Sequence, residues 1–88
     1  MLYVIEFTDE VLEEQLSKIP KTMRQRILKA IQERLSIAPL DYGKPLQYNL
    51  KNRRRIRVGD YRVIYRVYED RVLVLIMEID HRKDVYKD

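Results

Sequence analysis

The strongest constraint on the fold is the stretch from Lys51 to Arg66, KNRRRIRVGDYRVIYR, which has the pattern of two strands joined by a tight turn. Alternating residues flank Gly59-Asp60, and a two-residue hairpin turn needs the positive φ that glycine adopts without steric cost. If Val58 pairs with Tyr61, the register follows, and directly paired residues share a face. One face then contains Arg53, Arg55, Arg57, Arg62, Ile64 and Arg66, and the other contains Ile56, Val58, Tyr61, Val63 and Tyr65, with Arg54 at its rim.

Like charges lie opposite one another on the face with five arginines. Arg57 is paired with Arg62 and Arg53 with Arg66, and we expect no acid beside them on that face. Such pairs destabilise a hairpin by about 0.2–1 kcal/mol. One interpretation is a solvated face on which long side chains splay apart. We favour an anion-binding face, because five arginines create a strong positive field and arginine suits bidentate phosphate contacts.

The distribution of charge along the chain supports this interpretation. Residues 51–66 contain seven basic residues and one acid, whereas the rest of the chain contains eleven basic and thirteen acidic residues. A concentrated basic segment indicates a polyanionic partner, with nucleic acid as the first candidate. The length of 88 residues predicts a single domain, 1–88.

Composition also argues against several kinds of site. The chain has no cysteine and one histidine, so we expect no disulfide, no metal site and no cofactor. No N-terminal stretch has the layout of a signal peptide, and the longest apolar run, Val72 to Met77, is too short to span a bilayer. We therefore expect a soluble cytoplasmic protein that does not bind membranes.

Hydrophobic periodicity and turn residues predict the element order β-α-α-β-β-β. Thr8 is a plausible N-cap, and Pro20 separates two amphipathic helices. Prolines and a glycine within 39–45 indicate a loop, and Leu46 to Leu50 is consistent with a loop or a short strand. Helices are expected over 9–17 and 21–37, and strands over 2–7, 53–58, 61–68 and 71–79. The fold class is α+β, with a helical hairpin packed on a mostly antiparallel twisted sheet.

The C-terminal segment adds candidate residues if the last turn is as tight as the first. With Tyr68 paired to Arg71, Met77 lies near Arg62. The following segment then brings three more polar side chains towards the arginines: His81, Arg82 and Tyr86. Together these groups suit RNA backbone cleavage, because arginines stabilise developing charge and a phenol or imidazole transfers protons. Each also has a simpler interpretation. Tyr86 packs against the edge of the sheet, His81 forms a hydrogen bond in a turn, and Arg82 forms a surface ion pair with Asp84 or Asp80.

The string RIRVGDYRVIYRV, followed by an apolar strand and HRKDVY, resembles the RelE/ParE superfamily of toxin–antitoxin toxins over nearly the whole chain. The resemblance implies a single RelE-like toxin domain that a cognate RelB-like antitoxin neutralises. It also implies contact with operator DNA only through the toxin–antitoxin complex. RelE-type members cut mRNA in the ribosomal A site without metal: the 2′-hydroxyl attacks the adjacent phosphate. ParE-type members poison DNA gyrase instead and lack the catalytic set.

The resemblance also implies roles for individual residues. The GYR arginine matches Arg62, for transition-state charge, and the catalytic tyrosine matches Tyr86, as general base. The C-terminal arginine matches Arg82, for leaving-group stabilisation, with a one-residue ambiguity towards His81, a possible acid. The residues expected to contact RNA are Lys51, Arg53, Arg54, Arg55, Arg57 and Arg66.

Two departures from the family pattern affect these roles. The RelE type commonly has lysines where this chain has Arg53 and Arg55, and arginine does not give up a proton near neutral pH. Proton transfer then depends on Tyr86 or His81. The chain stops two residues after Tyr86, so the C-terminal helix of some relatives, and regulation by its displacement, are not expected. The alternatives are a ParE-like gyrase inhibitor and a non-catalytic nucleic-acid-binding module.

Overall fold

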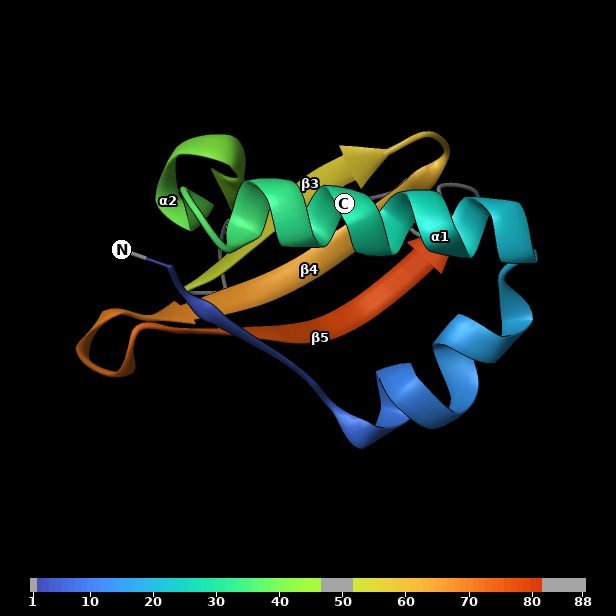
Figure 1. The fold of residues 1–88 in the computed structure, drawn as a ribbon, viewed down its shortest axis with the longest axis horizontal. Coiled ribbons are helices and arrows are strands. Elements are labelled where there is room, and N and C mark those ends of the chain that lie inside the picture. Colours follow the sequence, from blue (N-terminus) through green and yellow to red (C-terminus); the bar gives the residue numbers. More distant parts are fainter. Residues whose placement is uncertain (1, 47–51, 82–88) are drawn as a thin grey trace.

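The computed structural model describes residues 2–46 and 52–81, in which helices pack on a five-stranded mixed sheet with strand order β1-β5-β4-β3-β2 (Figure 1). This confirms the expected α+β class. The elements in chain order are β1 Val4–Phe7, η1 Val11–Gln15, η2 Leu16–Lys18, α1 Lys21–Ala30, η3 Ile31–Leu35, α2 Pro39–Tyr42, β2 Lys44–Pro45, β3 Arg53–Val58, β4 Tyr61–Tyr68, η4 Glu69–Arg71 and β5 Leu73–His81.

The helical part of the chain supplies one side of the core. The Thr8 hydroxyl accepts a hydrogen bond from the Val11 amide (3.3 Å), which confirms the predicted N-cap. The first helix has π-type and then 3₁₀ turns, and Pro20 precedes the regular helix α1. Figure 1 shows α1 crossing in front of the sheet. Most of the apolar stripe predicted from helical spacing packs in the core, and its fully enclosed members are Val11, Ile27, Ile31 and Leu35. The prediction was wrong for Leu12, which is 52% exposed.

The β3–β4 hairpin has the register expected from the sequence. Val58 pairs with Tyr61, and the pairing continues without interruption to Arg53 and Arg66. Gly59 has φ +60°, the left-handed conformation that a tight hairpin turn requires. The helix-facing side chains of β4, Val63 and Tyr65, are completely buried. The arginines therefore lie on the opposite face of the sheet, as the alternation predicts.

The segment expected to be a loop contains two short elements. Pro39 occupies the first turn of α2, where a missing amide hydrogen costs nothing, and β2 pairs with β3 through Lys44 and Pro45. Tyr65 Oη donates to the Pro39 carbonyl (2.6 Å), which anchors α2 to the sheet. A Cβ at Gly43 would lie 1.8 Å from Tyr65 Oη, so glycine is needed here for close approach. Residues 47–50 of the ambiguous Leu46–Leu50 segment lie outside the described residues.

The prediction for the β4–β5 connection was wrong. Tyr68 pairs with Leu73 and not with Arg71, because the turn lacks glycine and uses the 3₁₀ segment η4 followed by Val72 at φ +52°. A β-bulge then adds one residue to β5, so that Tyr65 pairs with Ile76 but Ile64 pairs with Glu78. As a result, Asp80 lies opposite Arg62, where the sequence predicted Met77.

The first strand, β1, forms the edge of the sheet opposite β2. β1 pairs with β5 in parallel, from Val4 opposite Leu73 to Phe7 opposite Ile76. Within the described residues, no helix is both long and apolar enough to cross a membrane.

Candidate functional site

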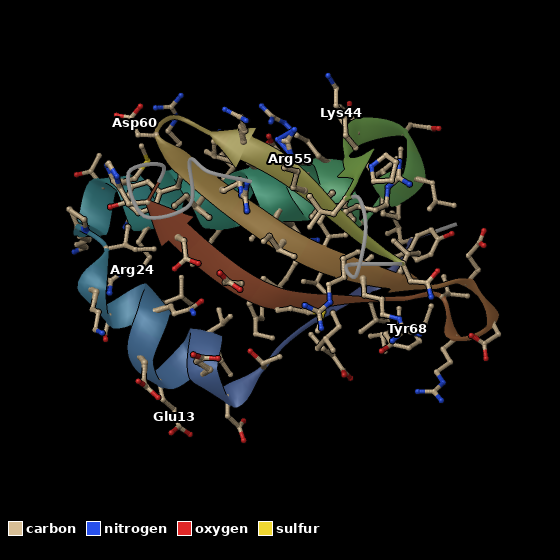
Figure 2. All side chains as sticks on the ribbon, turned by 180° about the vertical axis from the view of Figure 1, so that it is seen from behind. Glu13, Arg24, Lys44, Arg55, Asp60 and Tyr68 are labelled. Carbon is tan, nitrogen blue, oxygen red and sulfur yellow. The ribbon has the colours of Figure 1, made fainter. Side chains whose placement is uncertain are left out.

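The arginine face is the side of the sheet that turns away from α1, and we define it by Arg53, Arg55, Arg57, Arg62 and Arg66. Figure 2 views the molecule from this side, with Arg55 at β3 and Tyr68 near the end of β4. Three of the arginines come from β3 and two from β4, and the hairpin register places them in opposed pairs. The predicted clustering of these five residues on one face is therefore present.

Arg62 differs from the other arginines because its side chain is only 6% exposed. Burial lowers its pKa below the ordinary value for arginine, and the positive charges of Arg55 and Arg57 act in the same direction. The nearby carboxylates of Glu78 and Asp80 act in the opposite direction. A buried guanidinium held between cations and carboxylates has a fixed position, so little reorganisation is needed when a phosphate arrives.

Two acids share the arginine face, which sequence reasoning missed. The expectation that no acid lies beside the paired arginines is wrong, because the bulge places Glu78 opposite Ile64 and Asp80 opposite Arg62. The sequence did contain a signal: the buried residues Ile76 and Ile79 are three positions apart, which a regular strand does not allow.

The environment of Glu78 changes its proton affinity. A hydrogen bond to Asp80, partial burial and the Asp80 charge together raise the Glu78 pKa from 4.5 to about 7. Arg62 lowers this pKa, and Glu10 raises it. Glu78 is thus a carboxyl group beside Arg62 that exchanges a proton near neutral pH.

Positive charge continues around the edge of the sheet beyond the arginine face. A hollow of about 370 Å³ is lined by Arg34 from η3 and Lys44 from β2 together with Arg55 and Arg57. Figure 2 shows Lys44 at this edge, beside α2. Arg34 and Lys44 come from segments that the sequence placed in a helix and a loop, so only the tertiary fold brings them to the arginines.

An aromatic ring, that of Tyr68, lies at the C-terminal end of β4. The Arg66 guanidinium lies 4.7 Å from the centre of the Tyr68 ring, and that of Arg71 lies 5.4 Å from it. Arg66 and Tyr68 are two residues apart on one strand and so share a face. Sequence reasoning did not select Tyr68, although its alternation with Arg66 places a ring at the end of the arginine face.

Two predicted site residues, His81 and Arg54, are not brought to this face. His81 pairs with Tyr61, and their rings meet edge to face with centroids 5.0 Å apart. Because Tyr61 alternates with Arg62, His81 lies on the helix side of the sheet. Arg54 also lies on that side, where its Nη2 donates to the carbonyls of Leu40 (2.7 Å) and Gly43 (2.6 Å).

The remaining predictions cannot be compared with the structure. Lys51, Arg82 and Tyr86 lie outside the described residues. Among residues 2–46 and 52–81, no group of three or more His, Cys, Asp or Glu side chains is arranged to hold a metal ion.

Comparisons with known proteins give one consistent family. The family model described as "ParE toxin of type II toxin-antitoxin system, parDE" matches residues 5–86. Toxin RelG of Mycobacterium tuberculosis (strain ATCC 25618 / H37Rv) is 33% identical over 87 residues, which cover 99% of each chain.

Solved structures agree with the fold. A chain of the toxin–antitoxin complex RelBE2 from Mycobacterium tuberculosis matches with a TM-score of 0.86 and 32% identity, over 93% of both chains. A chain of the archaeal RelE–RelB complex from Pyrococcus horikoshii OT3 matches with a TM-score of 0.73 and 26% identity, over 93% of this chain and 97% of that one. The RelE-like architecture expected from the sequence is confirmed.

Proposed function

The chain belongs to the ParE toxin family of type II toxin–antitoxin systems, within the RelE/ParE superfamily, and from this premise we propose that it is a ribosome-dependent mRNA endonuclease of the RelE type. The observation that supports this activity most strongly is the buried Arg62, which lies opposite Arg57 and diagonal to Arg55 on the arginine face. A fixed cation of this kind suits a phosphate at which negative charge develops.

The proposed reaction uses the RNA's own nucleophile. The 2′-oxygen loses its proton and forms a bond to the adjacent phosphorus, while the bond from phosphorus to the 5′-oxygen breaks. The products are a 2′,3′-cyclic phosphate and a 5′-hydroxyl. Arg62 neutralises the phosphoryl oxygens in the transition state, and positioned proton transfer adds about 10²–10⁴-fold.

The other arginines hold the RNA backbone. Guanidinium groups bind phosphate through two parallel hydrogen bonds, and the members of the arginine face that serve this role are Arg53, Arg55, Arg57 and Arg66. Tyr68 offers a ring on which a base can stack. Arg54 acts from the helix side of β3, where its hydrogen bonds to the carbonyls of Leu40 in α2 and of Gly43 hold the edge of the sheet in place.

Residues of the HRKDVY segment complete the proposed site by resemblance to the RelE type. Tyr86 acts as general base, which requires neighbouring cations to lower its pKa from the ordinary value of about 10. Arg82 stabilises charge on the leaving group. The protein acts in the cytoplasm on ribosome-bound mRNA, and a RelB-like antitoxin, whose relatives accompany the matched structures, neutralises it.

The deciding experiment is ribosome-programmed mRNA cleavage mapped at nucleotide resolution. The proteins compared are the purified chain, its Arg62→Gln and Tyr86→Phe variants, and Lys29→Gln, a control on the exposed side of α1. We expect cuts in the A-site codon that Arg62→Gln slows by about 10²–10³-fold and that Lys29→Gln leaves unchanged. No cleavage by the unaltered chain on engaged ribosomes would overturn the proposal.

A gyrase poison of the same fold is the second candidate, because the matching family model is that of the ParE toxin. It predicts inhibition of DNA supercoiling by the purified chain, with full inhibition retained by Tyr86→Phe. A non-catalytic nucleic-acid-binding module predicts steeply salt-dependent RNA or DNA binding without growth arrest.

A further inference from the structure

Two rows of side chains cross the arginine face at right angles to the strands. One row runs from Arg57 through Arg62 to Asp80, and the neighbouring row runs from Arg55 through Ile64 to Glu78. Adjacent strands lie about 4.8 Å apart, and diagonal neighbours on one face remain within reach of long side chains. Glu78 and Arg62 are such diagonal neighbours, so both can reach one phosphodiester.

The proposed RNA cleavage requires a proton donor for the leaving group, and these two rows contain candidates for it. When the bond from phosphorus to the 5′-oxygen breaks, that oxygen leaves as an alkoxide unless a donor supplies a proton. The arginines of the face cannot donate near neutral pH. His81, the acid suggested by the sequence, lies with Tyr61 on the other side of the sheet. Among the described residues of the face, the proton-carrying candidates beside Arg62 are therefore Glu78 and Asp80.

We propose that Glu78, supported by Asp80, is the proton donor to the 5′-oxygen leaving group. This assignment rests on the proposed endonuclease function. In its protonated form Glu78 donates to the Asp80 carboxylate, which keeps the proton on this face until substrate binds. As the bond from phosphorus to the 5′-oxygen breaks, the Glu78 proton moves to that oxygen, and Glu78 is left as a carboxylate beside Arg62.

The charged groups around Glu78 are consistent with this role. Asp80 lies on the same strand, Arg62 on the adjacent strand β4, and Glu10 in the first helical turn after β1. The hydrogen bond to Asp80, partial burial and the charges of the two acids favour the protonated form, Arg62 favours the carboxylate, and the Glu78 pKa is raised to about 7. A donor should have a pKa near the working pH, because it must both hold and release a proton there.

The test compares two mRNAs in the ribosome-programmed assay. One is a normal mRNA, and the other has sulfur in place of the 5′-bridging oxygen at the cut site. A sulfur leaving group departs without a proton, so it needs no donor. We expect Glu78→Gln to cleave the normal mRNA about 10²–10⁴-fold more slowly than the unaltered chain and the sulfur mRNA at nearly the unaltered rate.

Glu6→Gln is the matched control, since Glu6 is an exposed carboxylate that pairs with Leu75 on the same sheet face, away from the Arg62 row. It should cleave both mRNAs normally. With the normal mRNA, the slope of log rate against pH should decrease for the unaltered chain above about pH 7, where Glu78 loses its proton, and Glu78→Gln should lack this break. Asp80→Asn should move the break to lower pH, because Asp80 raises the Glu78 pKa.

The outcomes separate this assignment from the proposed function. If the unaltered chain cuts neither mRNA, the endonuclease proposal fails and the donor role fails with it. If the unaltered chain cuts and Glu78→Gln cuts the normal mRNA equally fast, the donor role alone is overturned. Equal slowing on both mRNAs also overturns it, because that result indicates a structural role for Glu78.

Discussion

At the scale of single residues, the close approach of Gly43 to Tyr65 holds α2 against the sheet beside the arginine face. The Tyr65 ring is completely buried, and its hydroxyl reaches under Gly43 to the Pro39 carbonyl. Its pKa is raised, chiefly by burial, so the hydroxyl keeps its proton and remains a donor. From the sequence, Gly43 was interpreted only as a loop marker. Its need for close approach depends on Tyr65, which is 22 positions away, and no local pattern reports that contact.

We predict that Gly43→Ala lowers the free energy of unfolding by about 1–3 kcal/mol, because the added methyl group overlaps Tyr65 Oη. In a Tyr65→Phe background the same change should cost less, since the closest atom is gone. Urea unfolding of the four proteins of this double-mutant cycle measures the difference. Purely additive effects would show that the two residues do not interact.

At the scale of elements, the two hairpins differ in how well the sequence predicts them. Gly59 allows one tight turn, and every pair of β3–β4 follows from it. The β4–β5 connection has no glycine, so it uses four residues and a left-handed Val72, and the bulge then shifts the register again. The spacing of Ile76 and Ile79 indicates an irregularity in β5, but the tertiary packing that selects the bulge cannot be inferred from local sequence. The acids beside Arg62 were missed for this reason, and so was the position of His81 on the helix side.

The opposed arginines of the β3–β4 hairpin have a cost in stability. We predict that Arg57→Gln raises the free energy of unfolding by about 0.2–1 kcal/mol, because Arg57 lies opposite Arg62. The gain should shrink at high salt, which screens exposed charges. Urea unfolding at low and high salt tests this, with Lys29→Gln on α1 as the equal charge change outside the sheet. A loss of stability in Arg57→Gln at low salt would contradict the prediction.

At the scale of the whole molecule, the two faces of the sheet differ in what they contribute. One side of the sheet packs on the helices and supplies the buried core, and the other presents the arginines with the two acids of β5. The sequence predicted this separation from alternation alone. It did not predict Arg34 and Lys44 beside Arg55 and Arg57, because these residues meet only through the packing of η3 and β2 on the sheet edge.

Binding of single-stranded RNA to the free protein should depend steeply on salt. If three to five phosphates are neutralised, the logarithm of the association constant falls with the logarithm of salt concentration with a slope of about −2 to −3.5. Arg53→Gln should reduce the slope by about 0.7, and Lys29→Gln should not change it. Fluorescence anisotropy at four salt concentrations gives these slopes. A slope near zero would contradict binding through the arginine face.

The parallel pairing of β1 with β5 has a consequence for the order of events during synthesis. Val4 is synthesised 69 residues before its partner Leu73. Contacts so distant in sequence form late, because the intervening chain must first be ordered. The sheet therefore cannot be completed before β5 has left the ribosome. The row from Arg57 through Arg62 to Asp80 also needs β5, so it is assembled at the same late stage.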